Sequence, residues 1–140
     1  MISGKSSIVL ALQRATHATL HALAAQVANL GLTPAEINVL ANLADNRPRT
    51  VSELGRLSGS PPTTLTSVLD RLEGRGHVSR NRHPTDRRAL VVELTPSGRR
   101  AAASIRRAIT RLEQHLLGGL DTASIDGLRA GLDALAGATP

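Results

Sequence analysis

Three short segments in the middle of the chain each begin with a residue that can cap a helix. In "LTPAEINVLANLA", Thr33 precedes a proline and is followed three residues later by Glu36, the pattern of a capping box. "TVSELGRLSG" repeats the pattern with Thr50 and Glu53, and "SPPTTLTSVLDRLEGRG" begins with Ser60 as its expected cap. Because the last two segments are joined by a Ser-Gly turn, they predict a helix-turn-helix.

Each of these segments has apolar residues at helical intervals, so each is expected to bury one face. Gly59 is expected to turn the chain before the third helix, and Pro61 to occupy the first position of that helix. Gly74 and Gly76 are expected to end it. The residues predicted to face inward are Ile37, Leu40, Leu43 or Ala44, Val51, Leu54, Leu57, Leu65, Val68, Leu69 and Leu72. Helical bundles also contain pairs of helices joined by a short turn. The residues on the outward face of the third helix are therefore needed to distinguish a bundle from a DNA-binding element.

The outward face of the third helix is rich in short polar side chains. Ser and Thr are poor helix formers, so their concentration favours a function beyond solvation, although an ordinary solvated face is the alternative. Short hydroxyls allow a helix to approach DNA closely and to hydrogen-bond base edges and phosphates in the major groove. The DNA contacts predicted on this helix are Ser60, Thr63, Thr64, Thr66, Ser67, Asp70 and Arg71.

Residues 77–82 and 88–94 read as two strands around the turn "HPTD", which predicts a β-hairpin directly after the third helix. A hairpin tip contributes little to a core, so Arg87 and Arg88 are expected to serve a partner outside the chain. A hairpin beside a helix in the major groove reaches the next minor groove, whose negative potential attracts arginine. Asp86 is predicted to hold the Arg88 guanidinium in a bidentate pair. The predicted phosphate contacts are Arg80, Arg82 and Arg87.

The net charge of +6 is unevenly distributed along the chain. Residues 71–111 contain eleven arginines and three acidic residues, whereas residues 1–70 are nearly neutral and residues 112–140 are net negative. A basic middle indicates a polyanion-binding surface, with solvation of a helix face as the alternative for residues 99–111. The sequence contains no Phe, Tyr, Trp or Cys. Stacking on unpaired bases, disulfides, thiolate metal sites and thiol redox sensing are therefore excluded.

Four segments carry a recognisable pattern: "LTPAEINVLANLA", "TVSELGRLSG", "LTSVLDRLEGRGHVSR" and "PTDRRALVVELTPSGRRA". Together they resemble the MarR family of bacterial winged-helix transcription regulators, over about residues 32–103. The most specific part is Asp86 and Arg88 followed by Leu94, Thr95 and Gly98. The resemblance implies a homodimer that binds a palindromic operator, usually as a repressor, and that is often released by a small phenolic or other lipophilic ligand. Because the chain has no Cys, it is not one of the family's thiol-based peroxide sensors. It also lacks the aromatic residues that commonly line the ligand pockets of the family.

Both ends of the chain are predicted to form helices with an apolar stripe. The first is expected from about Ser6 to Leu30, would be about 35 Å long, and is ended by Gly31. Two further helices are expected after Thr95-Pro96 and after Gly118-Gly119. The stripes consist of Ile8, Leu12, Ala15, Thr19, Leu23, Val27 and Leu30, of Ile105, Ile109, Leu112 and Leu116, and of Ile125, Leu128, Leu132 and Leu135.

These observations predict a mainly α fold with a small β-hairpin wing, that is, a winged helix-turn-helix with N- and C-terminal dimerisation helices. Residues 1–140 are expected to form a single domain. Within it, residues 1–31 and 99–140 are the predicted dimerisation helices, and residues 32–98 the predicted DNA-binding lobe. Two recognition helices held one helical turn of DNA apart would read two half-sites.

The first helix also presents candidates for an effector site. Arg14, His17 and His21 share a face opposite the apolar stripe, and the resemblance implies an effector pocket between this helix and the DNA-binding lobe. These three residues, with Asn38 or Asn42, would suit an aromatic carboxylate or phenolate; an exposed polar face is the alternative. His17 and His21 could form half of a metal site, but the remaining ligands would have to come from elsewhere. Neither a metal nor another cofactor is predicted.

The leading hypothesis is therefore a ligand-responsive, dimeric repressor that binds double-stranded DNA. An effector-independent DNA-binding protein and a winged helix used for protein contacts are the alternatives. An enzyme is not expected, because the sequence offers neither a Gly-rich phosphate loop nor a Ser/His/acid set at suggestive spacing. No apolar run approaches the length of a membrane span and the N-terminus lacks a signal-peptide pattern, so a cytoplasmic location is expected.

Overall fold

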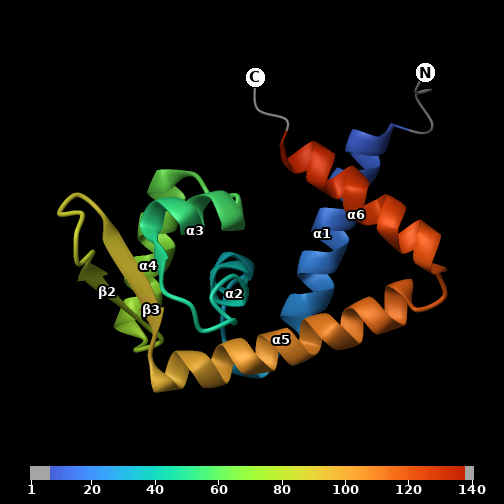
Figure 1. The fold of residues 1–140 in the computed structure, drawn as a ribbon. Coiled ribbons are helices and arrows are strands. Elements are labelled where there is room, and N and C mark those ends of the chain that lie inside the picture. Colours follow the sequence, from blue (N-terminus) through green and yellow to red (C-terminus); the bar gives the residue numbers. More distant parts are fainter. Residues whose placement is uncertain (1–6, 138–140) are drawn as a thin grey trace. The chain divides into compact units, whose positions relative to one another are not determined.

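The structure is a computed structural model that describes residues 7–137, and helices α2, α3 and α4 lie beside a small antiparallel sheet in it (Figure 1). The chain divides into two compact units, one up to Ile109 and the other from Thr110, with the boundary inside α5. This mainly helical fold with a small sheet confirms the predicted class. The elements are α1 (Ile8–Gln26), a 3₁₀ turn η2 (Ala28–Leu30), α2 (Pro34–Ala41), β1 (Arg49–Thr50), α3 (Val51–Ser58), α4 (Pro62–Gly74), β2 (Val78–Arg82), β3 (Leu90–Leu94), α5 (Pro96–Leu117) and α6 (Thr122–Ala136).

The capping box that opens α2 is confirmed. The Thr33 hydroxyl accepts the Glu36 amide at 3.2 Å, and the Glu36 carboxylate accepts the Thr33 amide at 3.0 Å. The second box is only half formed. Thr50 caps α3 by accepting the Glu53 amide at 3.1 Å, but within the described residues the Glu53 carboxylate returns no hydrogen bond and lies 4.0 Å from Arg49 instead.

The predicted start of α4 is wrong by one residue. Pro61, and not Ser60, is the cap, and the helix begins at Pro62. The reason is steric: a residue that precedes proline is disfavoured in the helical region, and Pro61 accordingly adopts an extended conformation with ψ of 152°. The Ser60 hydroxyl instead hydrogen-bonds the Ser58 hydroxyl at 3.1 Å, within the turn between α3 and α4.

The first helix is shorter than predicted. Ser7 caps α1, which ends at Gln26, and the 3₁₀ turn η2 then continues to Gly31, which has a positive φ of 64°. Ser6 lies outside the described residues. Of the predicted stripe only Leu23 and Val27 are buried, whereas Ile8 is 57% exposed.

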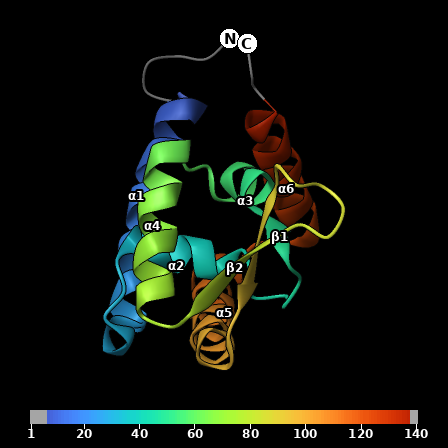
Figure 2. The ribbon, with the colours of Figure 1, turned by 90° about the vertical axis from the view of Figure 1, so that its left-hand side faces the viewer.

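The sheet has three strands where the sequence predicted two, in the order β1-β3-β2 with antiparallel pairing throughout. The hairpin of β2 and β3 pairs Arg80 with Val92 and Arg82 with Leu90. Strand β1 is only two residues long, directly before α3, and pairs Arg49 with Val92. A strand this short has no periodicity to detect, so pairing with β3 alone reveals it. Figure 2 shows β1 and β2 beside the helices of the same unit.

The core is aliphatic. The predicted inward positions Ile37 and Leu40 of α2 and all those of α4 are buried, as is Leu43 in the turn after α2, whereas its alternative Ala44 is half-buried. On α3, Leu54 is buried, Val51 is half-buried and Leu57 is 50% exposed. The start of α5 packs closely on the chain before β2: a Cβ at Gly98 would overlap the carbonyl group of His77. The largest fully buried side chains are Ile37, Leu40, Leu43, Leu54, Leu65, Leu69, Leu72 and Ile105.

The second unit contains the end of α5 and all of α6. Asp121 caps α6 by accepting the Ser124 amide at 2.8 Å. Hydrogen bonding from the Ser124 side chain, followed by this bond from the Ser124 amide, lowers the pKa of Asp121. No residue of α6 is buried, and Leu128 and Leu132 of its predicted stripe are 41% and 42% exposed. Within residues 7–137, no helix combines the length and apolar character that crossing a membrane requires.

Candidate nucleic-acid interface

Helix α4 buries one side and presents short hydroxyls on the other. Thr63, Thr64, Thr66 and Ser67 are all exposed, while Leu69 on the opposite side is buried. The Thr66 hydroxyl donates to the Pro62 carbonyl at 3.0 Å, a bond that leaves its oxygen lone pairs available to an outside donor. The predicted exposed face is therefore present on α4.

The far end of the same face is already paired internally. Arg71 donates to the Ser67 hydroxyl at 2.9 Å, one helical turn away. Asp70 accepts from Arg80 of β2 at 2.6 Å, and Glu73 accepts from the same guanidinium at 3.0 Å. Two residues predicted to touch DNA, Asp70 and Arg80, thus contact each other and join α4 to the hairpin.

Arg80 is largely covered, with 22% of its side chain exposed, and two carboxylates compensate its charge. The hydrogen bond from Arg80 lowers the pKa of Glu73, and the bonds to Glu73 and then Asp70 raise the pKa of Arg80. Sequence reasoning missed Glu73, although a carboxylate three residues after Asp70 lies on the same helix face. A phosphate contact by Arg80 stays a prediction, but the arginine would have to share its donors with these carboxylates.

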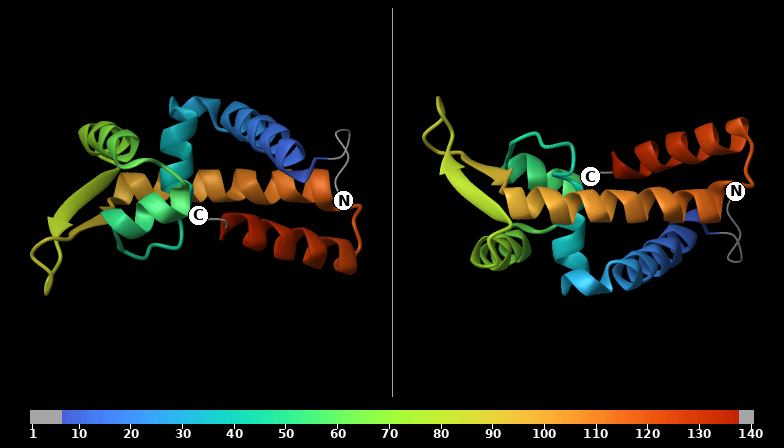
Figure 3. Two further views of the ribbon diagram at one scale, coloured as in Figure 1. Left: turned by 90° about the horizontal axis from the view of Figure 1, so that it is seen from above. Right: turned by 90° about the horizontal axis from the view of Figure 1, so that it is seen from below.

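The loop between β2 and β3 carries exposed arginines. Arg88 has 96% of its side chain exposed, and Arg82 and Arg87 are also exposed. The hairpin extends away from α3 and α4 in both views of Figure 3. The arginines are therefore accessible to a large partner.

The predicted bidentate pair between Asp86 and Arg88 is wrong. Asp86 Oδ1 accepts the Arg88 backbone amide at 3.0 Å, whereas the nearest guanidinium nitrogen, Nε, lies 3.9 Å away. A carboxylate accepting an amide two residues ahead forms an Asx turn, which competes with the side-chain pair for the same oxygen. Asp86 thus shapes the backbone that carries Arg88 and contacts its guanidinium only at the longer distance.

A histidine that the sequence analysis did not select organises the rest of this loop. His83 Nδ1 accepts the amides of Thr85 at 3.2 Å and Asp86 at 3.1 Å. Its own amide donates to the Ala89 carbonyl at 2.9 Å and closes the loop. The sequence feature that could have indicated this role is a histidine followed by a proline at the end of a predicted strand.

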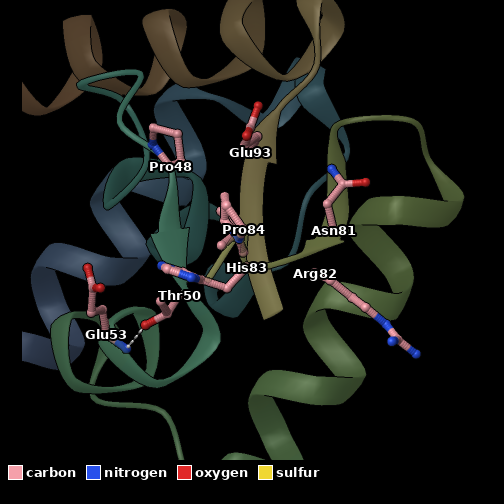
Figure 4. Close-up of a pocket in the computed structure, with 9 residues that line it drawn as sticks. Pro48, Thr50, Glu53, Asn81, Arg82, His83, Pro84 and Glu93 are labelled. Atoms are coloured by element: carbon pink, nitrogen blue, oxygen red, sulfur yellow. Dashed lines mark hydrogen bonds between the residues drawn. The ribbon is translucent and has the colours of Figure 1, made fainter. Parts of the chain in front are cut away.

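His83 also lines an open depression of about 310 Å³ on the outer side of the sheet, shown in Figure 4. The lining mixes polar, charged and apolar groups from β1, α3 and the hairpin. It is formed by Pro48, Thr50, Glu53, Asn81, Arg82, His83, Pro84, Val91 and Glu93.

Comparison with known proteins adds to this geometry. The sequence model of the MarR family matches residues 30–89. The HTH-type transcriptional regulator TtmR of Methylorubrum extorquens (strain PA1) is 34% identical over 131 residues, which cover 94% of this chain and 65% of TtmR. A solved structure of a probable transcriptional regulator from Pseudomonas aeruginosa is 30% identical, with a TM-score of 0.74 over 92% of this chain and 96% of that one. The chain belongs to the MarR family.

The MarR fold also recurs at lower identity. NadR, solved in complex with 4-hydroxyphenylacetate, is 22% identical, with a TM-score of 0.86 over 99% of both chains, and at this identity the likeness shows the fold alone. This chain spans only part of the curated regulators that it matches: the matched segments cover between 46% and 65% of the length of the first three.

The predicted effector contacts of this MarR-family chain are only partly assembled. Arg14, His17 and His21 are exposed on α1, and the two imidazole rings lie 4.3 Å apart. Asn38 is half-buried and donates to the Ser58 carbonyl at 2.7 Å, joining α2 to the end of α3. The Asn38 amide therefore has a structural partner. Among residues 7–137, no group of three or more His, Cys, Asp or Glu side chains is arranged to hold a metal ion.

Proposed function

We propose that this MarR-family chain is a DNA-binding transcriptional regulator that acts as a dimeric repressor on a palindromic operator in the bacterial cytoplasm. The observation that carries the proposal is the pairing of two exposed surfaces: the hydroxyl-rich face of α4 and the arginine-bearing loop that follows it. The Arg80 bridge joins the elements that carry them. No catalytic role is proposed, since the relatives are transcriptional regulators.

The two surfaces would have different tasks on DNA. Thr63, Thr64, Thr66 and Ser67 of α4 would contact base edges and nearby phosphates in the major groove, where short side chains permit close approach. Arg88 would enter the adjacent minor groove, and Arg82 and Arg87 would contact phosphates. Ser60 and Arg71, at the two ends of this face, are the further proposed contacts, and Asp70 and Asp86 would orient Arg80 and the loop.

A second copy of the chain would cover the apolar side chains that each unit leaves exposed. Large exposed apolar surface commonly marks a protein interface. Residues 1–31 and 99–140 are the proposed dimerisation helices. The exposed apolar residues within them are Ile8, Val9, Leu10, Leu116, Leu120, Leu128 and Leu132.

A small aromatic acid or phenol is the proposed effector, with Arg14, His17 and His21 as its polar contacts on α1. A cation beside two imidazoles suits a carboxylate or phenolate. NadR was solved with 4-hydroxyphenylacetate, a ligand of this class. Asn38 would contribute only if it exchanged its bond to Ser58 for one to the ligand.

Selection of bound duplexes from a random pool tests the proposal. We expect an enriched palindrome whose half-site centres are about 34–36 Å apart. A winged helix used for protein contacts, the alternative function, would enrich no sequence. Adding 4-hydroxyphenylacetate to the selected operator complex then separates a ligand-responsive repressor from an effector-independent one.

A further inference from the structure

The wing loop depends on one unprotonated ring nitrogen. His83 Nδ1 faces the backbone amides of Thr85 and Asp86, both of which are donors. The Thr85 hydroxyl also lies 3.3 Å from this nitrogen. An imidazole nitrogen accepts a hydrogen bond only when it carries no proton, so this geometry requires the neutral ring with its hydrogen on Nε2.

Protonation would reverse the role of Nδ1. It would then carry a hydrogen directed at two amide hydrogens, and both bonds to the loop would be lost. Each lost net hydrogen bond shifts an equilibrium constant by about threefold to tenfold. The Asp86 amide belongs to the residue whose carboxylate accepts the Arg88 amide, so the loss would extend to the backbone that carries Arg88.

We propose that neutral His83 is a positioning residue for Arg87 and Arg88, and that its protonation releases the wing loop and weakens the wing's hold on DNA. The effect on DNA rests on the proposed function, whereas the ordering of the loop does not. Histidine is the side chain whose charge normally changes near physiological pH, so operator affinity would fall as the medium becomes acidic.

The charged surroundings of His83 come from several elements. Glu53 of α3, Glu93 of β3 and Arg82 of β2 line the same depression, and Asp86 lies in the loop itself. A protonated His83 would also add a cation near DNA, an effect that by itself would tighten binding, so the sign of the pH dependence decides between the two effects.

The His83→Asn substitution keeps a hydrogen-bond acceptor at this position but removes the group that can be protonated. In His83→Asn, the side-chain Oδ1 takes the place of Nδ1, can accept the same amides and does not titrate. His83→Ala removes the acceptor. His115→Asn, on an exposed residue of α5, is the matched control.

The first measurement uses the full chain without DNA. At about pH 8, the Thr85 and Asp86 amides should be protected from hydrogen exchange in wild type and His83→Asn, but about threefold to tenfold less in His83→Ala. At about pH 5.5, wild type should lose this protection while His83→Asn keeps it. Protection that is equal in all three proteins, or that wild type keeps in acid, would overturn the proposal.

The second measurement uses the selected operator. Between the same two pH values, wild-type affinity should fall about threefold to tenfold relative to His83→Asn, and His115→Asn should follow wild type. Burial, followed by Arg75, lowers the pKa of His77, so folding stability also declines as pH falls below the unfolded value, but equally in all variants. Parallel profiles for wild type and His83→Asn, or relative tightening of wild type in acid, would refute the wing effect. Absence of any sequence-specific binding alongside the expected amide protection would refute the proposed function and leave the positioning role intact.

Discussion

Arg80 on β2 donates a 2.6 Å hydrogen bond to Asp70 on α4, and the two residues are ten positions apart in the sequence. The same guanidinium contacts Glu73, so one side chain connects α4, the proposed recognition helix, to the hairpin. The orientation of α4 relative to the hairpin is therefore held by a charged contact on the surface proposed to face DNA.

Replacing this arginine by an uncharged side chain of similar length should weaken DNA binding. In Arg80→Met, the Asp70 and Glu73 carboxylates lose their compensating cation and repel phosphates, so we expect a loss of operator affinity of about tenfold or more. Asp70→Asn combined with Arg80→Met should recover part of it. Unchanged affinity in Arg80→Met would contradict this role.

The Arg80→Met substitution should also change the pKa of Glu73 in the absence of DNA. Arg80 lowers the pKa of Glu73 in the folded protein, a contribution to stability that is present above the unfolded pKa and lost as pH falls through the folded one. In Arg80→Met, the Glu73 pKa should rise toward its ordinary value, as measured by NMR titration of the carboxyl carbon.

Removing a hydroxyl from α4 should reduce sequence discrimination more than general affinity. Thr66→Ala or Ser67→Ala should lower discrimination against a wrong base by about 1–3 kcal/mol if the hydroxyl contacts a base edge. Thr16→Ala on α1 is the matched control for an exposed helical threonine. Equal weakening on specific and nonspecific DNA would show that the face does not read bases.

The wing arginines should differ in what they recognise. Arg88→Ala should remove a preference for A·T-rich over G·C-rich DNA under the wing, because narrow A·T-rich grooves attract inserted arginine. Arg87→Ala should instead lower the salt dependence of binding by about one unit in the logarithmic slope, as expected for a phosphate contact. The thermal midpoint should stay nearly constant in both. Full retention of the groove preference in Arg88→Ala would exclude the minor-groove role.

Asp86 provides a test of how the loop is built. Asp86→Asn keeps an oxygen that can accept the Arg88 amide, whereas Asp86→Ala does not. We therefore expect Asp86→Asn to bind the operator about as well as wild type, and Asp86→Ala to bind more weakly. Equal loss in both variants would show that the charge of Asp86 matters more than its bond to the backbone.

Charges placed on the exposed stripe of α6 should disrupt association. Leu128→Glu with Leu132→Glu would put carboxylates where a second copy is proposed to pack, so sedimentation at micromolar concentration should show a monomer. Asp126→Glu, on the same helix, is the control. A dimer that persists in the double variant would place the interface elsewhere.

A methyl group at Gly98 should destabilise the fold. Its Cβ would overlap the His77 carbonyl, so Gly98→Ala should cost about 1–3 kcal/mol of unfolding free energy or more. Gly131→Ala has open space around the new methyl and should instead stabilise by up to about 1 kcal/mol through helix propensity. Chemical denaturation measures both. Similar effects of the two substitutions would mean that the start of α5 can move away from β2.

Features whose partners lie within a few residues could be predicted from the amino-acid sequence. The Thr33 box, the buried leucines of α4 and the hairpin follow from spacings of two, three and four residues, because helix and strand geometry bring those positions together. Pro62 could also have revealed the true cap of α4, since the restriction that it places on Pro61 is local.

Contacts between distant groups, or between groups with competing partners, depend on the folded arrangement of the whole chain. Strand β1 exists because β3 offers it free backbone groups, and Arg80 lies between Asp70 and Glu73 because the sheet brings β2 against α4. Asp86 could bond a backbone amide or a guanidinium, and the loop geometry selected the amide. His83 acquired its role in the same way, since a ring nitrogen accepts from whichever donors the folded chain places within reach.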